Sequence, residues 1–424
     1  MKLNEVKICV IGLGYVGLPL ARLFSTKFET IGFDMNQKRV DALMQGHDAT
    51  LEVSDELLQD AINNHGFVCT TDIEKIRHCN FYVVAVPTPV DEDNYPDLAP
   101  LCGASETVGK VISKGDIVVY ESTVYPGVTE DECLPVVERV SGLKFNEDFF
   151  AGYSPERINP GDKEHTVEKI KKVTSGSTPE IADIVDRIYN TVLVNGTHKA
   201  PSIKVAEASK IIENSQRDVN IAFMNELARV FNVMGIDTHD VIEAASSKWN
   251  FIKLTPGLVG GHCISVDPYY LIQKAQVYGV WPRIMMTARR LNDTMGEYVA
   301  EQVIKRMNLK GVLVKDAKIL ILGITFKENC PDIRNTKVVD IYNGLREYTQ
   351  NITICDPLAN KEAVKHEYQV DIIHEIPQEK FDVIILAVAH NEFMAIDFKQ
   401  LTKDPSVIYD VKGFLPRNII DGRL

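Results

Sequence analysis

Short apolar runs alternate with longer amphipathic stretches over the first half of the chain. This alternation predicts strand–helix units, and therefore a parallel sheet covered by helices on both faces. The expected strands, in chain order, are 7–12, 29–34, 81–86, 116–121 and 149–153.

The pattern changes after about residue 200. Residues 202–232 contain no strand signal and are rich in Ala, Glu, Lys and Asn, which predicts one long helix, and helical character resumes around 269–307. A second strand–helix series follows at 317–322, 351–355, 382–388 and 407–410. The predicted fold class is therefore α/β, with two Rossmann-like, doubly wound parallel-sheet domains joined by a long central helix and a helical middle domain. The expected domain boundaries are 1–200, 201–308 and 309–424.

Composition narrows the class of protein. Of the 424 residues, 45% are hydrophobic and 25% are charged, which is typical of a soluble globular protein. No apolar run approaches the roughly 20 residues that span a bilayer, and the first residues do not resemble a signal peptide, so we expect a cytoplasmic protein without a membrane partner. The net charge of −13 argues against nucleic acid as a partner. Eight cysteines occur singly, without a CxxC pair, which predicts reduced thiols and no metal site.

A GxGxxG motif at residues 12–17 directly follows the first predicted strand. Gly12 permits a tight turn, Gly14 lets the backbone approach a pyrophosphate, and Gly17 lets the next helix pack closely on the strand. Asp34 ends the second strand at the spacing of the acid that binds ribose hydroxyls. Its carboxylate would repel a 2′-phosphate, and no Arg follows immediately, so the predicted cofactor is NAD and not NADP.

Two later segments, 86–89 and 121–123, also follow strands of this sheet. Ligands of open α/β folds bind at the carboxyl ends of the strands, although either segment alone could be an ordinary turn. The predicted cofactor-binding residues in this half of the chain are Gly12, Gly14, Tyr15, Val16, Gly17, Asp34, Thr88 and Thr123.

Polar side chains form a stripe on the predicted long helix. The stripe spans about a quarter of the helical circumference and consists of Glu207, Lys210, Asn214, Arg217 and Asn225. A solvated face is the ordinary explanation of such a stripe. Here Asn residues accompany single Lys and Arg residues, without the alternating Glu/Lys pairs of exposed faces, which favours a functional stripe.

A glycine-rich loop, 255–261, precedes Cys263. A lone cysteine is usually a small packing residue. Glycine on one side and Asp267 on the other favour a nucleophile instead, activated by the nearby Lys210. His262 is a weaker candidate for a general base, because its side chain should point away from that of its neighbour.

The segment 321–336 opens the second strand–helix series with a strand and Gly323 but lacks the full dinucleotide motif. The segment is therefore predicted to bind another phosphate-containing group in preference to a second NAD. Lys327 and Arg334 are the candidate phosphate contacts.

Taken together, the chain resembles the nucleotide-sugar 6-dehydrogenase family, the UDP-glucose and GDP-mannose dehydrogenases, over nearly its whole length. The resemblance rests on the Gly-Gly-His-Cys loop at 260–263, the segment 153–157, the pair Lys210 and Asn214, and the segment 326–334. The variants at 154–162, 214–220 and 255–263 resemble the branch that acts on UDP-N-acetylhexosamines. Pro160 stands where UDP-glucose dehydrogenases often carry a second Glu, which leaves the general base open.

The resemblance implies an NAD-dependent, four-electron oxidation of the sugar C6 hydroxyl to a uronic acid by two successive hydride transfers. Cys263 would hold the sugar as a thiohemiacetal and then as a thioester, which water hydrolyses. Lys210 and Asn214 would stabilise the oxyanion, and Thr123, Glu156 and Asp267 would handle water and protons.

By the same resemblance, the residues that contact the UDP-sugar are Glu156, Arg157, Lys210, Asn214, Arg217, Gly260 and Lys327, and Arg334 joins the cofactor-binding set. The resemblance also implies a homodimer, or a higher homo-oligomer, paired through the long helix.

Three alternatives stay open at this point. UDP-glucose or GDP-mannose could replace the favoured substrates, UDP-GlcNAc and UDP-GalNAc. A two-electron dehydrogenase of the 3-hydroxyacid type would need neither Cys263 nor the residues beyond about 310. A non-catalytic NAD-binding scaffold would have no need of Cys263 and Lys210, both of which are present.

Overall fold

The computed structural model describes residues 1–91, 94–157, 166–261 and 263–424. These form two compact units, which we call the N-terminal unit (Met1–Glu213 with Tyr269–Lys274) and the C-terminal unit (Asn214–Pro268 with Ala275–Leu424). The three-domain division at 200 and 308 stays a prediction. His262 and most of the 154–162 motif, including Pro160, lie outside the described residues. No helix within the described ranges is long and apolar enough to cross a membrane.

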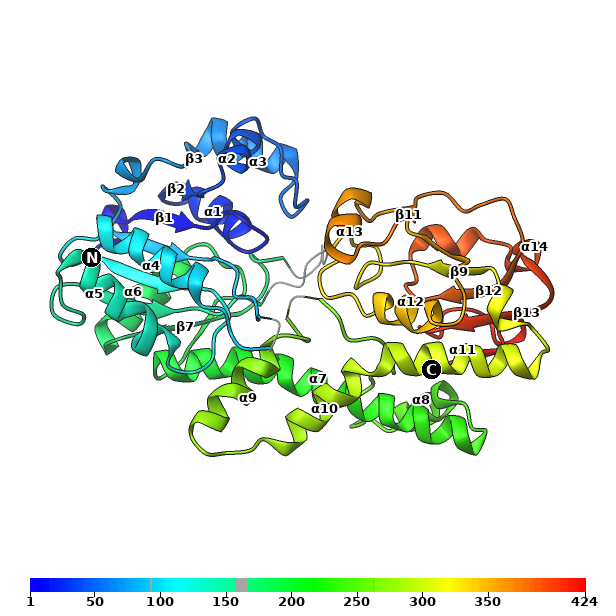
Figure 1. The fold of residues 1–424 in the computed structure, drawn as a ribbon. Coiled ribbons are helices and arrows are strands. Elements are labelled where there is room, and N and C mark those ends of the chain that lie inside the picture. Colours follow the sequence, from blue (N-terminus) through cyan, green and yellow to red (C-terminus); the bar gives the residue numbers. More distant parts are fainter. Residues whose placement is uncertain (92–93, 158–165, 262) are drawn as a thin grey trace. The chain divides into compact units, whose positions relative to one another are not determined.

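The N-terminal unit is built on one sheet with the strand order β3-β2-β1-β4-β5-β6-β7-β8 (Figure 1). The step from β1 to β4 is the point where the chain reverses its direction of winding, as in a Rossmann fold. The bounds are β1 (Lys7–Ile11), β2 (Glu29–Phe33), β3 (Val68–Thr70), β4 (Phe81–Val84), β5 (Ile117–Tyr120), β6 (Phe150–Tyr153), β7 (Lys172–Gly176) and β8 (Thr197–Lys199). The five predicted strands are all present, and β3, β7 and β8 were not predicted.

Helices cover both faces of this sheet. Apolar side chains of α1, α3 and α6 pack on one face, and those of α4, α5 and the start of α7 (Ile203–Met234) pack on the other. The bounds are α1 (Gly17–Ser25), α2 (Gln37–Met44), α3 (Asp55–His65), α4 (Ala99–Val111), α5 (Leu134–Ser141) and α6 (Pro179–Asn190).

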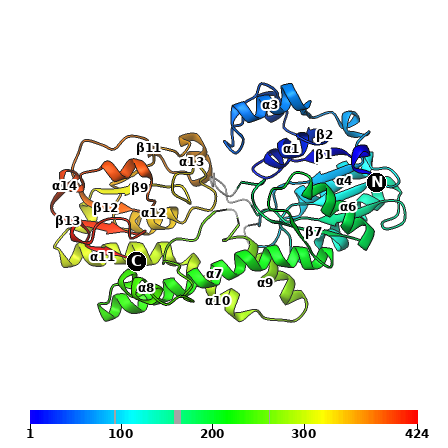
Figure 2. The same cartoon turned by 180° about the vertical axis from the view of Figure 1, so that it is seen from behind.

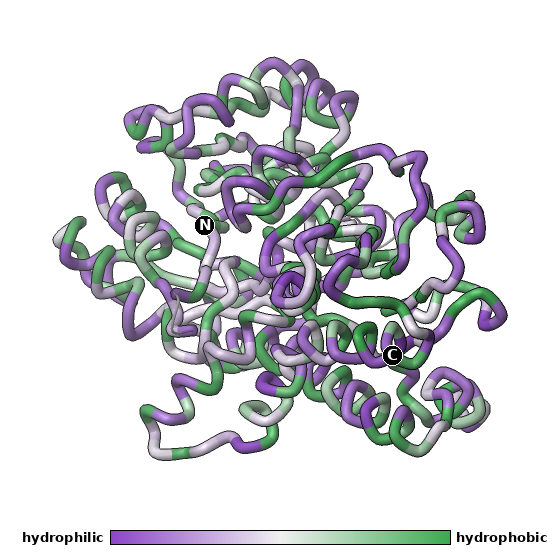
Figure 3. The backbone as a smooth tube through the Cα atoms, turned by 45° about the vertical axis from the view of Figure 1, so that its right-hand side comes forward, coloured by the Kyte–Doolittle hydropathy of each residue, from purple (hydrophilic) through white to green (hydrophobic). Residues whose placement is uncertain are grey.

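Strands buried on both faces explain the unbroken apolar runs of the sequence. In β1, Ile8 and Val10 join the core cluster on one face of the sheet, while Cys9 and Ile11 join the cluster on the other. The resulting succession of apolar and polar segments can be followed along the backbone in Figure 3.

The sheet departs from the predicted parallel arrangement at one pairing. β7 runs antiparallel to β6, with Gly152 opposite Gly176 and Tyr153 opposite Ser175. The prediction of a wholly parallel sheet was therefore wrong here. The sequence of β7, Lys-Val-Thr-Ser-Gly, contains one large apolar residue and therefore carried no strong strand signal.

The C-terminal unit contains a second sheet, entirely parallel among the described strands, with the order β11-β10-β9-β12-β13-β14. α11 (Met295–Leu309), α12 and α13 pack on one face, and α14 packs on the other. The bounds are β9 (Ile319–Leu322), β10 (Ile352–Cys355), β11 (Ile372–Ile373), β12 (Phe381–Leu386), β13 (Thr402–Asp410), β14 (Gly422–Arg423), α12 (Val338–Arg346), α13 (Lys361–Tyr368) and α14 (Phe398–Leu401). The predicted second Rossmann-like sheet is confirmed.

The predicted long helix is confirmed as α7 (Ile203–Met234), which runs unbroken in both views (Figure 1; Figure 2). The helical region after the glycine-rich loop divides into several helices. Their bounds, with that of the helix following α7, are α8 (Thr238–Ser246), α9 (Asp267–Val277), α10 (Arg283–Asp293) and α11 (Met295–Leu309).

Glu207 anchors the first turns of α7 to the N-terminal sheet. Its side chain is fully buried and accepts hydrogen bonds from the amides of Gly127 (2.6 Å) and Thr129 (2.9 Å). Thr129 begins the helical turn that leads into α5, where amides lack partners within the helix. Burial raises the pKa of Glu207 to about 7, against the lowering effect of the two amides. For this member of the polar stripe, the role is structural.

We expect Glu207→Ala to lower the free energy of unfolding by about 2–4 kcal/mol near pH 6, because two buried amides lose their acceptor. The raised pKa means that the folded state holds a proton that the unfolded state releases, so the penalty should shrink as pH rises from about 4.5 through 7. Denaturant unfolding at several pH values measures both effects. Lys204→Ala, one turn earlier in exposed ion pairs, should cost less than about 1 kcal/mol, and equal costs for the two variants would contradict the anchor.

Candidate active site

The glycine motif forms the turn between β1 and α1, and each glycine has a different physical reason. Gly12 has a φ of +93°, and a Cβ there would lie 2.6 Å from the carbonyl oxygen of Ala85. A Cβ on Gly17 would lie 1.8 Å from the carbonyl oxygen of Gly12. A Cβ on Gly14 would meet no described atom within 4 Å. Gly12 and Gly17 are therefore required by packing, whereas Gly14 leaves open space beside the start of α1, as a bound pyrophosphate needs.

Asp34 lies at the end of β2, where its carboxylate accepts hydrogen bonds from the amides of Leu13 (2.9 Å) and Asn36 (2.9 Å). These bonds hold the half-exposed carboxylate beside the glycine turn. Arg39 is the nearest following arginine, and its guanidinium donates to the carbonyl oxygen of Leu13 and pairs with Asp48 at 2.7 Å. With that cation already engaged, the site fits NAD better than NADP.

The segments after β4 and β5 are joined to each other at the same edge. The Ser122 hydroxyl donates to the carbonyl oxygen of Val86 (2.7 Å), and the Tyr153 hydroxyl donates to that of Ser122 (3.0 Å). Thr88 is buried and Thr123 half-buried in these segments. The structure therefore brings these two predicted residues to the carboxyl edge that also carries the glycine turn.

Behind this edge lies a buried charged cluster that the sequence did not predict, composed of Glu121, Glu156, Lys172 and Tyr189. Lys172 and Glu121 are fully buried, with Nζ 2.6 Å from Oε2, and Nζ is 3.7 Å from Oε2 of Glu156. The Tyr189 hydroxyl donates to Oε1 of Glu121 (2.5 Å). Burial raises the pKa of Glu121 to about 7, although the Lys172 charge lowers it. Burial acts to lower the pKa of Lys172, but the two carboxylates outweigh it and raise that pKa.

The remaining members of the α7 stripe divide by exposure. Lys210 and Asn214 are buried and lie one helical turn apart, so they share a face. Asn214 donates through Nδ2 to Oδ2 of Asp267 (2.5 Å), which is itself buried. Arg217 is exposed. Within the N-terminal unit, Arg157 forms an ion pair with Glu213, which lies on the neighbouring face of the helix.

The cysteine loop is tied to other segments of the C-terminal unit. Asn225 donates to the carbonyl oxygen of Gly257 (3.0 Å) and accepts from its amide (2.8 Å). Asn335 donates to the carbonyl oxygen of Gly261 (3.0 Å). The carbonyl oxygen of Cys263 accepts from the amide of Asp267 (2.8 Å), so the half-buried cysteine lies in the turn that begins α9.

The glycines of this loop allow close contact with the segment 324–337. A Cβ on Gly260 would lie 2.6 Å from the carbonyl oxygen of Asn335, and one on Gly261, at a φ of +87°, would lie 2.8 Å from the ring of Phe326. The predicted nucleophile loop and the predicted phosphate-binding segment are therefore packed together.

That segment follows β9 at the switch point of the second sheet, where β9 neighbours β12. A narrow hollow there is lined by residues from 258–260, 325–338, 387–388 and 412. Lys327 is half-buried in the segment, and Arg334 pairs with Asp332 at its end. Both predicted phosphate contacts thus belong to the loop at the switch point, where ligands of such sheets bind.

The two glycine turns have the same backbone arrangement but different acids. Gly12 and Gly323 each donate to the residue that ends the neighbouring strand, at 2.8 Å in both cases. Asp356 occupies the place of Asp34, yet it is fully buried and lies 3.1 Å from His390. Burial opposes ionisation there, but hydrogen bonds from His390 and the Ile324 amide lower the pKa of Asp356 to about 2. Because the Asp356 carboxylate is buried and already hydrogen-bonded, it cannot bind a ribose. This agrees with the prediction that the segment 321–336 binds a ligand other than a second NAD.

Comparison with known proteins matches three successive segments to models of one family. Residues 6–193 match the NAD binding domain of the UDP-glucose/GDP-mannose dehydrogenase family, residues 204–294 its central domain, and residues 320–417 its UDP binding domain. The chain belongs to the UDP-glucose/GDP-mannose dehydrogenase family. The predicted resemblance is confirmed, and so is NAD as the cofactor of an NAD-dependent nucleotide-sugar dehydrogenase.

Members of this family include full-length relatives of this chain. It is 55% identical to a UDP-N-acetyl-D-glucosamine 6-dehydrogenase of Pseudomonas aeruginosa over 425 aligned residues, which cover 100% of both proteins. It is 53% identical to a UDP-N-acetyl-D-glucosamine 6-dehydrogenase of Salmonella typhi, with 100% of this chain and 99% of the relative covered. Among solved structures, a UDP-D-ManNAc dehydrogenase from Pyrococcus horikoshii aligns with a TM-score of 0.89 at 26% identity, over 99% of this chain and 98% of that one.

We expect Gly14→Ala to weaken NAD binding at least about ten-fold while changing the free energy of unfolding by less than about 1 kcal/mol, because the added methyl group enters open space. Gly17→Ala should weaken both binding and folding, since its Cβ would collide with the backbone. Calorimetric titration with NAD and thermal unfolding measure the two effects. Gly103→Ala, an exposed position inside α4, is the matched control: it should leave NAD binding unchanged and raise the free energy of unfolding by about 1 kcal/mol or less. NAD binding by Gly14→Ala as tight as by this control would contradict the assignment.

Proposed function

We propose that this enzyme oxidises the C6 hydroxyl of a UDP-N-acetylhexosamine to the uronic acid, with UDP-GlcNAc or UDP-GalNAc favoured as substrate. The observation that carries the proposal is the match, over the whole chain and above half identity, to relatives named UDP-N-acetyl-D-glucosamine 6-dehydrogenases. Those names favour UDP-GlcNAc. UDP-glucose and GDP-mannose are the alternative substrates to be tested.

The proposed chemistry assigns the covalent steps to Cys263. When bound, NAD supplies the hydride acceptor for both oxidations. The Cys263 sulfur adds to the C6 aldehyde to form a thiohemiacetal, and after the second oxidation it holds the sugar as a thioester. Lys210 and Asn214 donate to the oxygen at C6, and Asp267 orients Asn214 through the 2.5 Å bond between them.

The last step is hydrolysis of the thioester. A water oxygen attacks the carbonyl carbon, its proton passes to a carboxylate, the C–S bond breaks, and the Cys263 thiolate is released with the uronate. We assign Glu156 to that water, with Thr123 as a further hydrogen-bonding group. The burial of Glu156 beside a lysine supports this role, because a fixed carboxylate can orient a water molecule.

Binding of the nucleotide sugar is proposed for Lys327, Gly260, Arg157 and Arg217, with Arg334 near the cofactor. The packing of the cysteine loop against the segment 324–337 supports a role for both in holding one substrate. We further propose that the enzyme acts in the cytoplasm, where NAD is available as a soluble oxidant.

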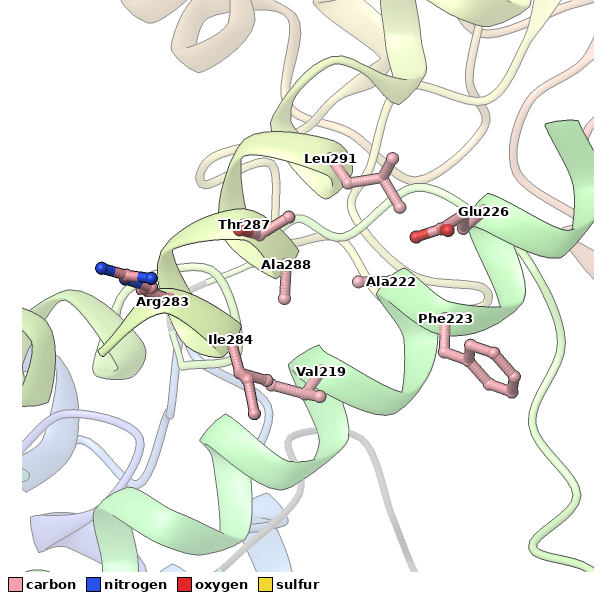
Figure 4. A pocket seen from close by; sticks show the side chains of 9 residues that line it. All are labelled: Val219, Ala222, Phe223, Glu226, Arg283, Ile284, Thr287, Ala288 and Leu291. Atoms are coloured by element: carbon pink, nitrogen blue, oxygen red, sulfur yellow. The ribbon is translucent and has the colours of Figure 1, made fainter. Parts of the chain in front are cut away.

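We also propose that the enzyme is a homodimer or a higher homo-oligomer paired through α7. Beside α7, α10 leaves a hollow of about 350 Å³ (Figure 4), lined by Val219, Ala222, Phe223, Glu226, Arg283, Ile284, Thr287, Ala288 and Leu291. Phe223 is 55% and Ile284 73% exposed. Apolar side chains left open on a long helix support a second copy as the occupant of this surface.

With limiting UDP-GlcNAc, we expect two NADH per sugar and a uronic acid product. Cys263→Ala should lower the rate at least about 10⁴-fold, because the acyl group loses its attachment point. Absorbance of NADH with UDP-GlcNAc, UDP-GalNAc, UDP-ManNAc, UDP-glucose and GDP-mannose in separate reactions measures yield and preference. One NADH per sugar would refute the thioester, and turnover confined to UDP-glucose or GDP-mannose would refute the substrate class.

In sedimentation velocity at micromolar concentration, we expect the wild-type enzyme to be a dimer or larger. Phe223→Glu combined with Ile284→Glu should shift it to monomer, because two charges would be buried in an apolar contact. Leu313→Glu, an equally exposed apolar side chain outside this surface, serves as the control and should leave the oligomer intact. A monomeric wild-type enzyme would contradict the proposal.

A further inference from the structure

Because β7 runs antiparallel to β6, its first residue, a lysine, lies at the carboxyl edge of the sheet. Parallel strands bring their last residues to the carboxyl edge of the sheet, whereas an antiparallel strand brings its first residue there. The first residue of β7 is Lys172. The pairing of Tyr153 with Ser175, continued by three residues, sets Glu156 opposite Lys172. The topology of the sheet therefore aligns this cation with the segment that follows β6.

The contacts of Lys172 agree with that register. Its Nζ donates to Oε2 of Glu121 (2.6 Å) and to the carbonyl oxygen of Pro155 (3.1 Å), and it lies 3.7 Å from Oε2 of Glu156. The ring of Tyr189 packs beside it, with its centroid 5.8 Å from Nζ. The side chain is fully buried, so every charge close to it matters more than it would in water.

From this geometry we propose that Lys172 is a positioning residue for thioester hydrolysis: it holds the Glu156 carboxylate in one orientation, while Glu121 and Tyr189 hold Lys172 in place. The inference rests on the proposed role of Glu156. During hydrolysis the attacking water forms a bond to the carbonyl carbon, its proton goes to Glu156, and the C–S bond to Cys263 breaks with the electron pair staying on sulfur. Lys172 takes no part in bond exchange.

The cluster gives Glu156 a fixed cationic partner in this chain, in which Pro160 stands where UDP-glucose dehydrogenases often carry a second Glu. Glu121, Glu156, Lys172 and Tyr189 are the titratable groups that β5, β6, β7 and α6 bring to this point in the described structure. Two carboxylates share one cation, so one of them gives up its charge most readily. The pKa of Glu121 is raised to about 7. Lys172 lies between the two carboxylates, with Glu121 at 2.6 Å and Glu156 at 3.7 Å.

The test compares Lys172→Met with Lys171→Met, an exposed neighbour with the same substitution. We expect Lys172→Met to produce a burst of NADH followed by turnover about 10- to 100-fold slower than wild type, with the acyl group accumulating on Cys263 in intact-mass spectra of acid-quenched enzyme. The rate of the NADH burst itself should change less than about three-fold. Lys171→Met should behave as wild type.

The pH dependence separates positioning from a merely structural role. Without the lysine charge the carboxylates retain a proton more readily, so the pH at which hydrolysis reaches half its maximum should rise by about 1–3 units. Lys172→Arg retains the charge and should keep the wild-type pH profile even if its rate falls. Glu121→Gln removes a competing negative charge and should move the profile to lower pH.

Burying Glu121 without its partner could prevent Lys172→Met from folding, and the double variant Glu121→Gln/Lys172→Met avoids this because it leaves no unpaired charge at that pair. It should show the same acyl accumulation and an upward shift in pH smaller than that of Lys172→Met, because the Glu121 charge is also absent. An equal slowing of every step, or an unchanged pH profile without an acyl adduct in the double variant, overturns the inference. If wild-type enzyme forms no adduct and Cys263→Ala stays active, the proposed function fails first, whatever Lys172 does.

Discussion

One constraint shapes both sheets: most of their strands are apolar and buried on both faces, so the charged groups lie mainly at the strand ends. An apolar strand interior leaves no place for a carboxylate or a lysine without a partner. In the N-terminal unit, the segments after β1, β4, β5 and β6 consequently carry the predicted site residues at one edge. The polar side chains gather at this edge because burial excludes unpaired polar groups from the strand interiors.

The buried cluster of Lys172 with two glutamates also lies at strand ends, and it is costly. Removing a lysine and a carboxylate from water costs several kcal/mol for each ion, and their attraction repays this only with good geometry. The 2.6 Å contact of Lys172 with Glu121 and the hydroxyl of Tyr189 supply that geometry. An apolar replacement would pack as well, so stability alone does not account for the cluster. The proposed role of Lys172 in positioning Glu156 would account for it.

Comparison of the two sheets shows how one backbone design serves two ligands. The glycine turns after β1 and β9 have matching hydrogen bonds, yet Asp34 stays half-exposed, whereas Asp356 is closed off by His390 and four backbone amides. The position that carries the predicted ribose-binding acid in the first sheet carries a buried structural acid in the second. The position of a residue in a fold is therefore a weaker guide to function than its exposure.

The sequence by itself determined the strand–helix order, the long helix, the NAD-binding turn and the family, because these depend on local periodicity and on motifs within short segments. It also placed Lys210 and Asn214 on one face, since helical spacing is fixed. Only the tertiary structure decided that Glu207 is an anchor, that Asn335 holds the cysteine loop, and that Lys172 faces Glu156. Those contacts join residues distant in the chain, and β7 is antiparallel for reasons of sheet pairing that no local pattern encodes.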